Sequence, residues 1–376
     1  MSYRRSNTCL KSYARLTSTL LIGLVVLLLS SNAFSTDVPT TAKRGTSTCK
    51  PLIIDHDGGT DDYIALLYML GDKKYCIKAI TTVTGIADAP RATLGTLRIL
   101  SKLNRSKIAI AQGITNQPHS FAEFIKKVQD KLPDSKSLAP SAAEIKQEKI
   151  DLRGFPTAEK ALTNIFQTSK APVTVLAIGP LSNIARYFRK HPKHLKLVER
   201  IVIMGGAVRV DGNSHSQPKK VSDISSEYNF FIDPESAAYV LNLPVPIQLV
   251  PLDATNYAFL RPAYIDRLHE ESFTAAKIAS DLLESERQFL EIEPGLAIYD
   301  GLAALALSHP ELMTWEDIYI NVNAAEPASG RTRPLTCTNK SAMKCRGKRK
   351  INVAVASWRR DIYDALTKGL RYNASR

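Results

Sequence analysis

Four carboxylates lie unusually close together in "PLIIDHDGGTDDYIALLYML", residues 51–70. Asp55, Asp57, Asp61 and Asp62 fall within eight consecutive positions, between two strongly apolar runs. The first apolar run predicts a buried strand, so the charges sit where water screens them least. Two carboxylates about 5 Å apart repel by about 3 kcal/mol at an effective dielectric near 20, whereas a helix N-terminus offsets only about 0.3–1 kcal/mol per charge. Either some of these aspartates are protonated or a cation is bound.

The spacing of the four aspartates predicts a single site. Side chains alternate along a strand, so Asp55 and Asp57 share a face. Two glycines then permit a tight turn, and Asp61 and Asp62 open the following helix. Oxygen ligands suit hard ions such as calcium and magnesium. The alternative interpretation is a run of capping and solvated carboxylates.

The rest of the chain predicts the elements that position this cluster. Short apolar runs rich in β-branched residues alternate with amphipathic helical stretches, for example "CIKAITTVTG" before "APRATLGTLRILSKL" and "APVTVLAIG" before "PLSNIARYFRKHP". This pattern predicts an α/β fold, with an open, mostly parallel, doubly wound (Rossmann-like) sheet and helices on both faces. Residues 114–157 break the rhythm and predict a helical insertion over the active site of a single domain. In such sheets the ligand lies beyond the carboxyl ends of the strands.

Seven sequence landmarks, in order, resemble the nucleoside hydrolase family, which includes inosine–uridine and purine-specific N-ribohydrolases. They are "IIDHDGGTDD", "TTVTG", "LAIGPLSNIA", "IVIMGGAV", "EYNFFIDPESA", "PLDAT" and "YDGLAALAL", between about Pro51 and about Leu307. The resemblance implies calcium-dependent hydrolysis of the N-glycosidic bond of ribonucleosides. "DHDGGT" also resembles the opening of the magnesium-dependent haloacid-dehalogenase-like phosphatases. That class needs an acidic motif after a later strand, and "IVIMGGAV" has no acidic pair.

The resemblance also implies roles for individual residues. The calcium ligands would be Asp57, Asp62 and Asp300, with the backbone carbonyl of Ile178. The residues that bind the ribose would be Asp61, Met204, Asn213, Glu227 and Asn229. Asp57 would be the general base toward a water whose pKa the calcium lowers.

Three positions depart from the family pattern. Tyr299 stands where one branch has a His that protonates the leaving base and another has a Trp that stacks on it. Ile86 stands where the family usually has Asn near the calcium. These two departures favour the alternative of a non-catalytic nucleoside- or ribose-binding protein. His56 replaces a small residue and is expected to face away from the metal.

Residues 1–35 have the pattern of an export signal. Basic residues precede a short apolar stretch, and Ala33-Phe34-Ser35 fits a small-x-small cleavage site. The apolar stretch is shorter than the roughly 20 residues of a spanning helix, the alternative being an uncleaved anchor. We therefore expect residues 36–376 to be exported (secreted or periplasmic), with no stable membrane association after cleavage. The family implies a small-molecule ribonucleoside as partner and a possible homodimer or homotetramer.

Four cysteines remain after the signal, which in an exported chain suggests two disulfides. Three pairings are possible. Cys49–Cys76 is favoured because the two residues precede strands expected to be parallel neighbours, and Cys337–Cys345 because they flank a basic loop, residues 330–350. The chain carries a formal net charge of +14. No aromatic interleaving accompanies the basic loop, so we expect no nucleic-acid partner.

Overall fold

The computed structural model describes residues 49–119, 154–213, 226–290, 296–325, 328–337, 345, 348–357 and 359–375. Its strands are β1 (Lys50–His56), β2 (Tyr75–Thr82), β3 (Ala109–Gln112), β4 (Val173–Ala177), β5 (Val198–Met204), β6 (Ile247–Val250), β7 (Met313–Val322), β8 (Thr332–Leu335) and β9 (Lys350–Ser357). They form one sheet in the order β3-β2-β1-β4-β5-β6-β9-β7-β8. Every neighbouring pair from β3 to β9 is parallel, whereas β7 runs antiparallel to both β9 and β8. The predicted mostly parallel, doubly wound sheet is thus confirmed.

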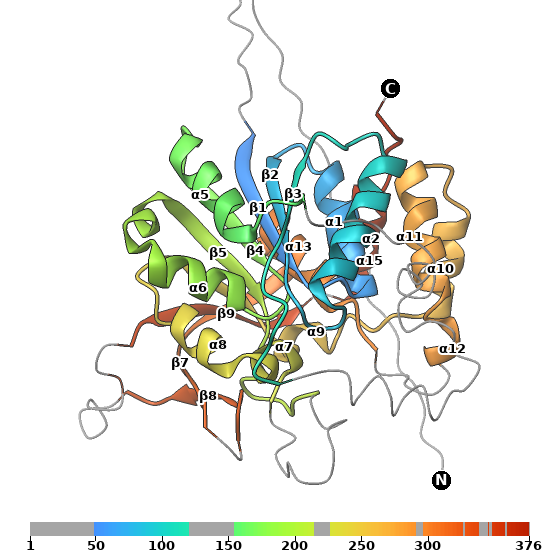
Figure 1. The fold of residues 1–376 in the computed structure, drawn as a ribbon. Coiled ribbons are helices and arrows are strands. Elements are labelled where there is room, and N and C mark those ends of the chain that lie inside the picture. The colour runs from blue at the N-terminus through green and yellow to red at the C-terminus, as the bar shows by residue number, and fades with distance from the viewer. Residues whose placement is uncertain are drawn as a thin grey trace, which may run out of the picture. The chain divides into compact units, whose positions relative to one another are not determined.

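Helices cover both faces of this sheet. They are α1 (Thr60–Gly71), α2 (Ala89–Lys102), α5 (Ala158–Thr168), α6 (Ser182–Lys190), α7 (Tyr228–Ile232), α8 (Pro234–Val240), α9 (Leu252–Thr255), α10 (Pro262–His269), α11 (Thr274–Glu284), α12 (Arg287–Leu290), α13 (Tyr299–Ser308) and α15 (Arg359–Gly369). Helices α5, α6 and α8 lie on one face, and α1, α10, α11, α13 and α15 on the other (Figure 1).

The two faces produce two buried cores. Along β1, Leu52 and Ile54 pack into the core beneath α1 and α13, whereas Ile53 packs into the core beneath α5 and α6. A strand buried on both sides has to be apolar at every position, which explains the unbroken "PLII" run. Residues Thr48–Arg376 form one compact unit.

The sheet has a switch point at β1. The chain moves from β1 outward through β2 to β3, and then returns to place β4 on the other side of β1. Neighbouring connections therefore diverge at the carboxyl end of β1, which leaves a crevice for a ligand. The acidic stretch begins at this end.

Several sequence predictions concern other parts of the chain. Both predicted disulfides, Cys49–Cys76 and Cys337–Cys345, are present. Residues 1–35 and most of the 114–157 insertion lie outside the described residues. The prediction of a loop throughout residues 330–350 is wrong at Thr332–Leu335, since this segment pairs with the edge of β7. None of the described helices combines the length and apolar character that crossing a bilayer demands.

Candidate active site

The turn after β1 brings the aspartates together. Gly58 has φ +80°, a backbone conformation that residues with a side chain rarely adopt, and it starts the sharp turn into α1. Asp62 then caps the start of α1, since its Oδ2 accepts the Gly59 N–H at 2.8 Å and its Oδ1 accepts the Asp57 N–H at 3.2 Å. These bonds hold the Asp62 carboxylate at the carboxyl end of β1.

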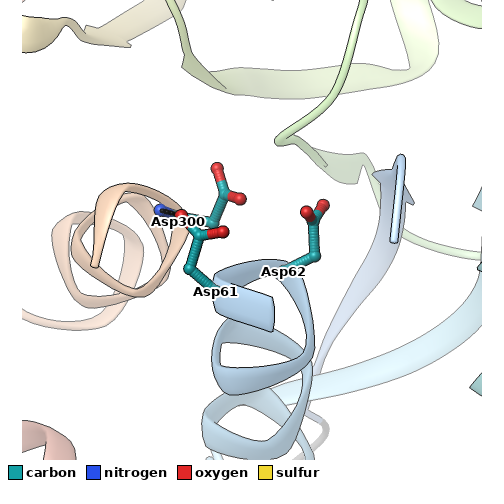
Figure 2. A group of neighbouring side chains, drawn as sticks. All are labelled: Asp61, Asp62 and Asp300. Carbon is teal, nitrogen blue, oxygen red and sulfur yellow. Dashed lines mark hydrogen bonds between the residues drawn. The ribbon is translucent and has the colours of Figure 1, made fainter. Parts of the chain in front are cut away.

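A third carboxylate arrives from a distant part of the chain. Asp300 lies in the first turn of α13, which packs against α1, and its N–H donates to Asp61 Oδ2 at 3.3 Å across 239 residues of sequence. Ligand oxygens of Asp61, Asp62 and Asp300 all lie within 4.8 Å of one another. Figure 2 shows the three side chains gathered above the N-terminus of α1. Asp300 Oδ1 is buried and has no hydrogen-bond partner in the described part of the chain.

Asp57 lies at the same end of the sheet, enclosed by backbone. It is 2% exposed, and its Oδ2 accepts the Ile86 N–H at 2.8 Å. A Cβ atom added to Gly85 would overlap this carboxylate. Ile86 thus contacts Asp57 through its main chain, so the departure from the family pattern removes a side-chain amide but leaves a backbone donor.

Burial raises the pKa of every carboxylate in this group, and neighbouring charges raise it further at Asp57, Asp62 and Asp300. Burial raises the pKa of Asp57 to about 7, against the Ile86 hydrogen bond, which lowers it. The pKa values of Asp62 and Asp300 lie well above their usual range, first because of burial and then because of the neighbouring aspartates, and that of Asp61 is raised by burial. Such carboxylates cannot all be ionised near neutral pH unless a cation balances them.

Asp55 lies behind this group and has a different surrounding. Its Oδ1 accepts hydrogen bonds from the Thr81 hydroxyl and from Asn183 Nδ2, the latter at 2.8 Å. Asn183 also donates to the Thr82 carbonyl at 3.0 Å, so it ties β1 to β2 at the start of α6. From the sequence, Asn183 is expected to be a helix cap and not a residue of the site.

Three of the residues predicted to bind ribose, Met204, Glu227 and Asn229, lie at the ends of β4 and β5. Asn229 Nδ2 donates to the carbonyls of Ile178 and Met204, at 3.3 and 3.4 Å. Glu227 caps α7 and accepts three backbone N–H groups, those of Gly206, Asn229 and Phe230. Burial raises its pKa to about 7. The structure therefore brings these residues to the same edge of the sheet as Asp57.

Tyr299 and Asn213 form the remaining side of the site. Tyr299 opens α13 directly before Asp300, and its hydroxyl hydrogen-bonds the Asn213 side chain, whose Oδ1 also accepts the Tyr228 N–H at 2.8 Å. Burial and then the charge of Asp61 raise the pKa of Tyr299 above its ordinary value. A raised pKa makes the phenol a weaker proton donor, which favours an aromatic contact over acid catalysis.

Two further polar residues near the acidic cluster were not anticipated. Glu286 is 5% exposed and accepts a hydrogen bond from the Thr60 hydroxyl at 2.6 Å. Burial raises its pKa to about 7. Tyr228 lies between Glu227 and Asn229, and burial followed by the charges of Asp57 and Glu227 raises its pKa.

The His56 ring lies between Thr96 of α2 and the Asp62 carboxylate. Its ring is fully buried, its Nε2 lies 2.9 Å from the Thr96 hydroxyl, and its Nδ1 lies 3.8 Å from Asp62 Oδ1. His56 therefore lies beside Asp62, and the expectation that it faces away from the metal stays a prediction.

The chain is similar to known proteins in sequence and in fold. The family model described as inosine-uridine preferring nucleoside hydrolase matches residues 52–360. The pyrimidine-specific ribonucleoside hydrolase RihA of Shewanella woodyi is 30% identical over 299 residues, 75% of this chain and 87% of that protein. The protein of the same name from Enterobacter sp. (strain 638) is 29% identical over 276 residues, 72% of this chain and 83% of its own length.

A solved plant nucleoside hydrolase, PpNRh1, superposes with a TM-score of 0.72 at 23% identity, covering 86% of this chain and 99% of the plant chain. This likeness supports the fold. The family model spans the strands and helices that carry Asp57, Asp62, Glu227 and Asp300. The chain belongs to the inosine–uridine preferring nucleoside hydrolase family.

Proposed function

We propose that this protein is a calcium-dependent ribonucleoside hydrolase, which cleaves the N-glycosidic bond to release the free base and ribose. One observation carries the proposal beyond family membership. Three carboxylates from two distant helices meet within 4.8 Å at the switch point of the sheet. A buried cluster of this kind needs a cation to be fully charged.

The donor set fits calcium. All side-chain donors are oxygens, as hard divalent ions prefer, and Asp300 Oδ1 is buried without a hydrogen-bond partner among the described residues. By the family resemblance Asp57, Asp62, Asp300 and the Ile178 carbonyl would hold the ion, whereas the cluster within 4.8 Å contains Asp61 in place of Asp57. Bound there, calcium would orient the ribose hydroxyls and make a water molecule more acidic.

The chain's own residues then perform the other tasks. Asp57 would act as the general base and accept the proton of the attacking water, because a bound cation keeps its carboxylate ionised. Departure of the base leaves a ribose with oxocarbenium character. The carboxylates of Asp61 and Glu227, held by backbone N–H groups, stabilise that positive charge.

Tyr299 would bind the base through its ring. Its hydroxyl is hydrogen-bonded to Asn213, and its raised pKa opposes proton donation. The same observation supports a second candidate function, that of a protein that binds nucleosides without hydrolysing them. Both candidates use the same residues, so turnover has to be measured directly.

A nucleoside panel tests the proposal. Purified protein is incubated with uridine, cytidine, inosine and adenosine, and the release of reducing sugar is followed with calcium and with a chelator. We expect turnover of at least one nucleoside with calcium, loss of turnover with the chelator, and recovery on adding calcium back. Binding in equilibrium dialysis without sugar release would instead identify the non-catalytic alternative, and chelator-resistant turnover would contradict the metal requirement.

We further propose that the chain acts outside the cytoplasm. Its two disulfides support this, because such bonds persist mainly in oxidising compartments. N-terminal sequencing of secreted or periplasmic protein should find a start directly after Ser35.

A further inference from the structure

The segment that follows β5, residues 205–213, contacts two parts of the site although it forms neither helix nor strand. Its Gly206 N–H donates to Glu227 Oε2 at 2.8 Å. At its far end the Asn213 side chain hydrogen-bonds the Tyr299 hydroxyl. The position of this segment therefore affects both a carboxylate expected to bind ribose and the ring that would bind the base.

A single carboxylate from the next strand connection holds this segment. Asp253 lies in the first turn of α9, which follows β6, and β6 is a parallel neighbour of β5. Its Oδ2 accepts the Val208 N–H and its Oδ1 accepts the Arg209 N–H, both at 2.8 Å. A third hydrogen bond runs from the Leu252 N–H to the Gly206 carbonyl at 2.9 Å. The segment is thus fixed to the start of α9.

Helix α9 gives this carboxylate a fixed position. Asp253 is 3% exposed, so little water competes for its oxygens. The Ser357 hydroxyl of β9 donates to the Ala254 carbonyl at 2.9 Å and ties α9 to the sheet. By contrast, the clustered aspartates lie on α1 and α13, and Asp57 accepts the Ile86 N–H. Asp253 therefore supports the substrate-binding side of the site and not the acidic cluster.

We infer that Asp253 is a positioning residue for nucleoside binding, which fixes the segment after β5 so that Asn213 holds the Tyr299 ring in place for the base. Without the carboxylate, two backbone N–H groups lose their acceptors and the segment can shift. Glu227 keeps its other two backbone donors, so the larger effect falls on Asn213 and Tyr299. The inference rests on the proposed function, and it assigns Asp253 no contact with the substrate.

The kinetics of Asp253→Asn test the inference with a nucleoside that the wild type hydrolyses. The amide keeps one acceptor oxygen and turns N–H groups toward the second backbone donor, so we expect KM to rise about tenfold with kcat within about threefold. Asp253→Glu keeps both oxygens but moves them by one methylene. It should raise KM about threefold, and it keeps the test decisive if the Asn variant folds poorly.

Asp233→Asn on α8 is the matched control. Asp233 is also a buried carboxylate at a helix start, and its Oδ1 accepts the Ser236 N–H at 3.0 Å. Its replacement removes the same kind of hydrogen bond without touching the segment after β5, so KM should stay within about twofold of wild type.

A double mutant separates positioning from a general loss of structure. In the Tyr299→Ala background the ring is gone, so Asp253→Asn should change KM by less than about twofold. Equal KM values for wild type and Asp253→Asn, or an undiminished effect in the Tyr299→Ala background, would overturn the inference alone. If the wild type binds nucleosides without turnover, the dissociation constant from equilibrium dialysis replaces KM with the same expectations. A wild type that neither hydrolyses nor binds any nucleoside of the panel would overturn the proposed function and this inference with it.

Discussion

Replacing Asp300 by Asn should stabilise the metal-free protein and destabilise the calcium-bound one. Asp300 is 4% exposed, and its carboxylate lies within 4.8 Å of ligand oxygens of Asp61 and Asp62. At that distance each pair of charges repels by about 3.5 kcal/mol at an effective dielectric near 20. Without a cation, the folded protein therefore keeps Asp300 protonated, and its pKa lies well above the unfolded value of 3.8.

The size of the effect follows from that difference. A carboxyl with a raised pKa in the folded state contributes stability at low pH that is lost as pH rises above the unfolded pKa. Each pH unit above 3.8 costs about 1.4 kcal/mol, as long as the folded group stays protonated. The cost is thus at most about 4 kcal/mol near pH 7 and under about 2 kcal/mol near pH 5. Asn has almost the same shape and never ionises, so Asp300→Asn should recover most of this free energy of unfolding.

Urea unfolding in a chelator, near pH 5 and near pH 7, measures the effect. Asp281→Asn on α11 removes one negative charge from an exposed position and serves as the control. In calcium the order should reverse, with wild type the more stable, because Asn is a poorer ligand. A gain for Asp300→Asn that does not grow with pH, or that Asp281→Asn matches, would refute the electrostatic reasoning.

Substitutions at three further places in the chain separate chemistry from packing. Tyr299→Phe should keep kcat within about threefold of wild type, because loss of a true proton donor would lower kcat about 100-fold or more. Tyr299→Ala should raise KM about tenfold, because the base loses the ring on which it stacks. An approximately 100-fold fall of kcat in Tyr299→Phe would identify Tyr299 as the general acid. Gly85→Ala should lower kcat about 100-fold with an unchanged circular dichroism spectrum, because the added methyl group displaces the Asp57 carboxylate. Full activity would show that the backbone around residue 85 shifts to accommodate the methyl group and leaves Asp57 in place. Joint replacement of Cys49 and Cys76 by Ser should lower the free energy of unfolding by about 2–4 kcal/mol. It should leave kcat unchanged, because the disulfide joins the starts of β1 and β2, at the end of the sheet opposite the site. A fall in kcat in the folded variant would contradict this prediction.

The sequence predicted the parallel half of the sheet because its strands are buried on both faces and read as continuous apolar runs. "PLII" and "VTVLA" became β1 and β4 on either side of the switch point. The antiparallel strands β7 and β8 were not predicted. In β7 exposed and buried residues are mixed, as in "TWEDIYI", and only pairing with β9 makes this segment a strand.

The residues of the site, too, were predictable only where a local sequence pattern marks them. Asp57 and Asp62 stood out because acids next to apolar runs are rare, whereas Asp300 was implied only by the resemblance of "YDGLAALAL" to the family. Glu286 lies within "LLESERQFLEIE", where charges are dense enough to predict a solvated helix. Its burial depends on meeting Thr60, 226 residues away, and no local pattern reports such a meeting.

The pairing of α1 with α13 affects how the protein is made. Asp61 and Asp62 leave the ribosome long before Asp300, so no nascent chain that ends ahead of α13 carries the complete set of three carboxylates. A cation that needs all three carboxylates binds only the finished fold, and this binding stabilises the folded state relative to the incompletely folded one. Calcium would thus act as a late check on assembly, and fragments truncated before residue 299 should gain nothing from it.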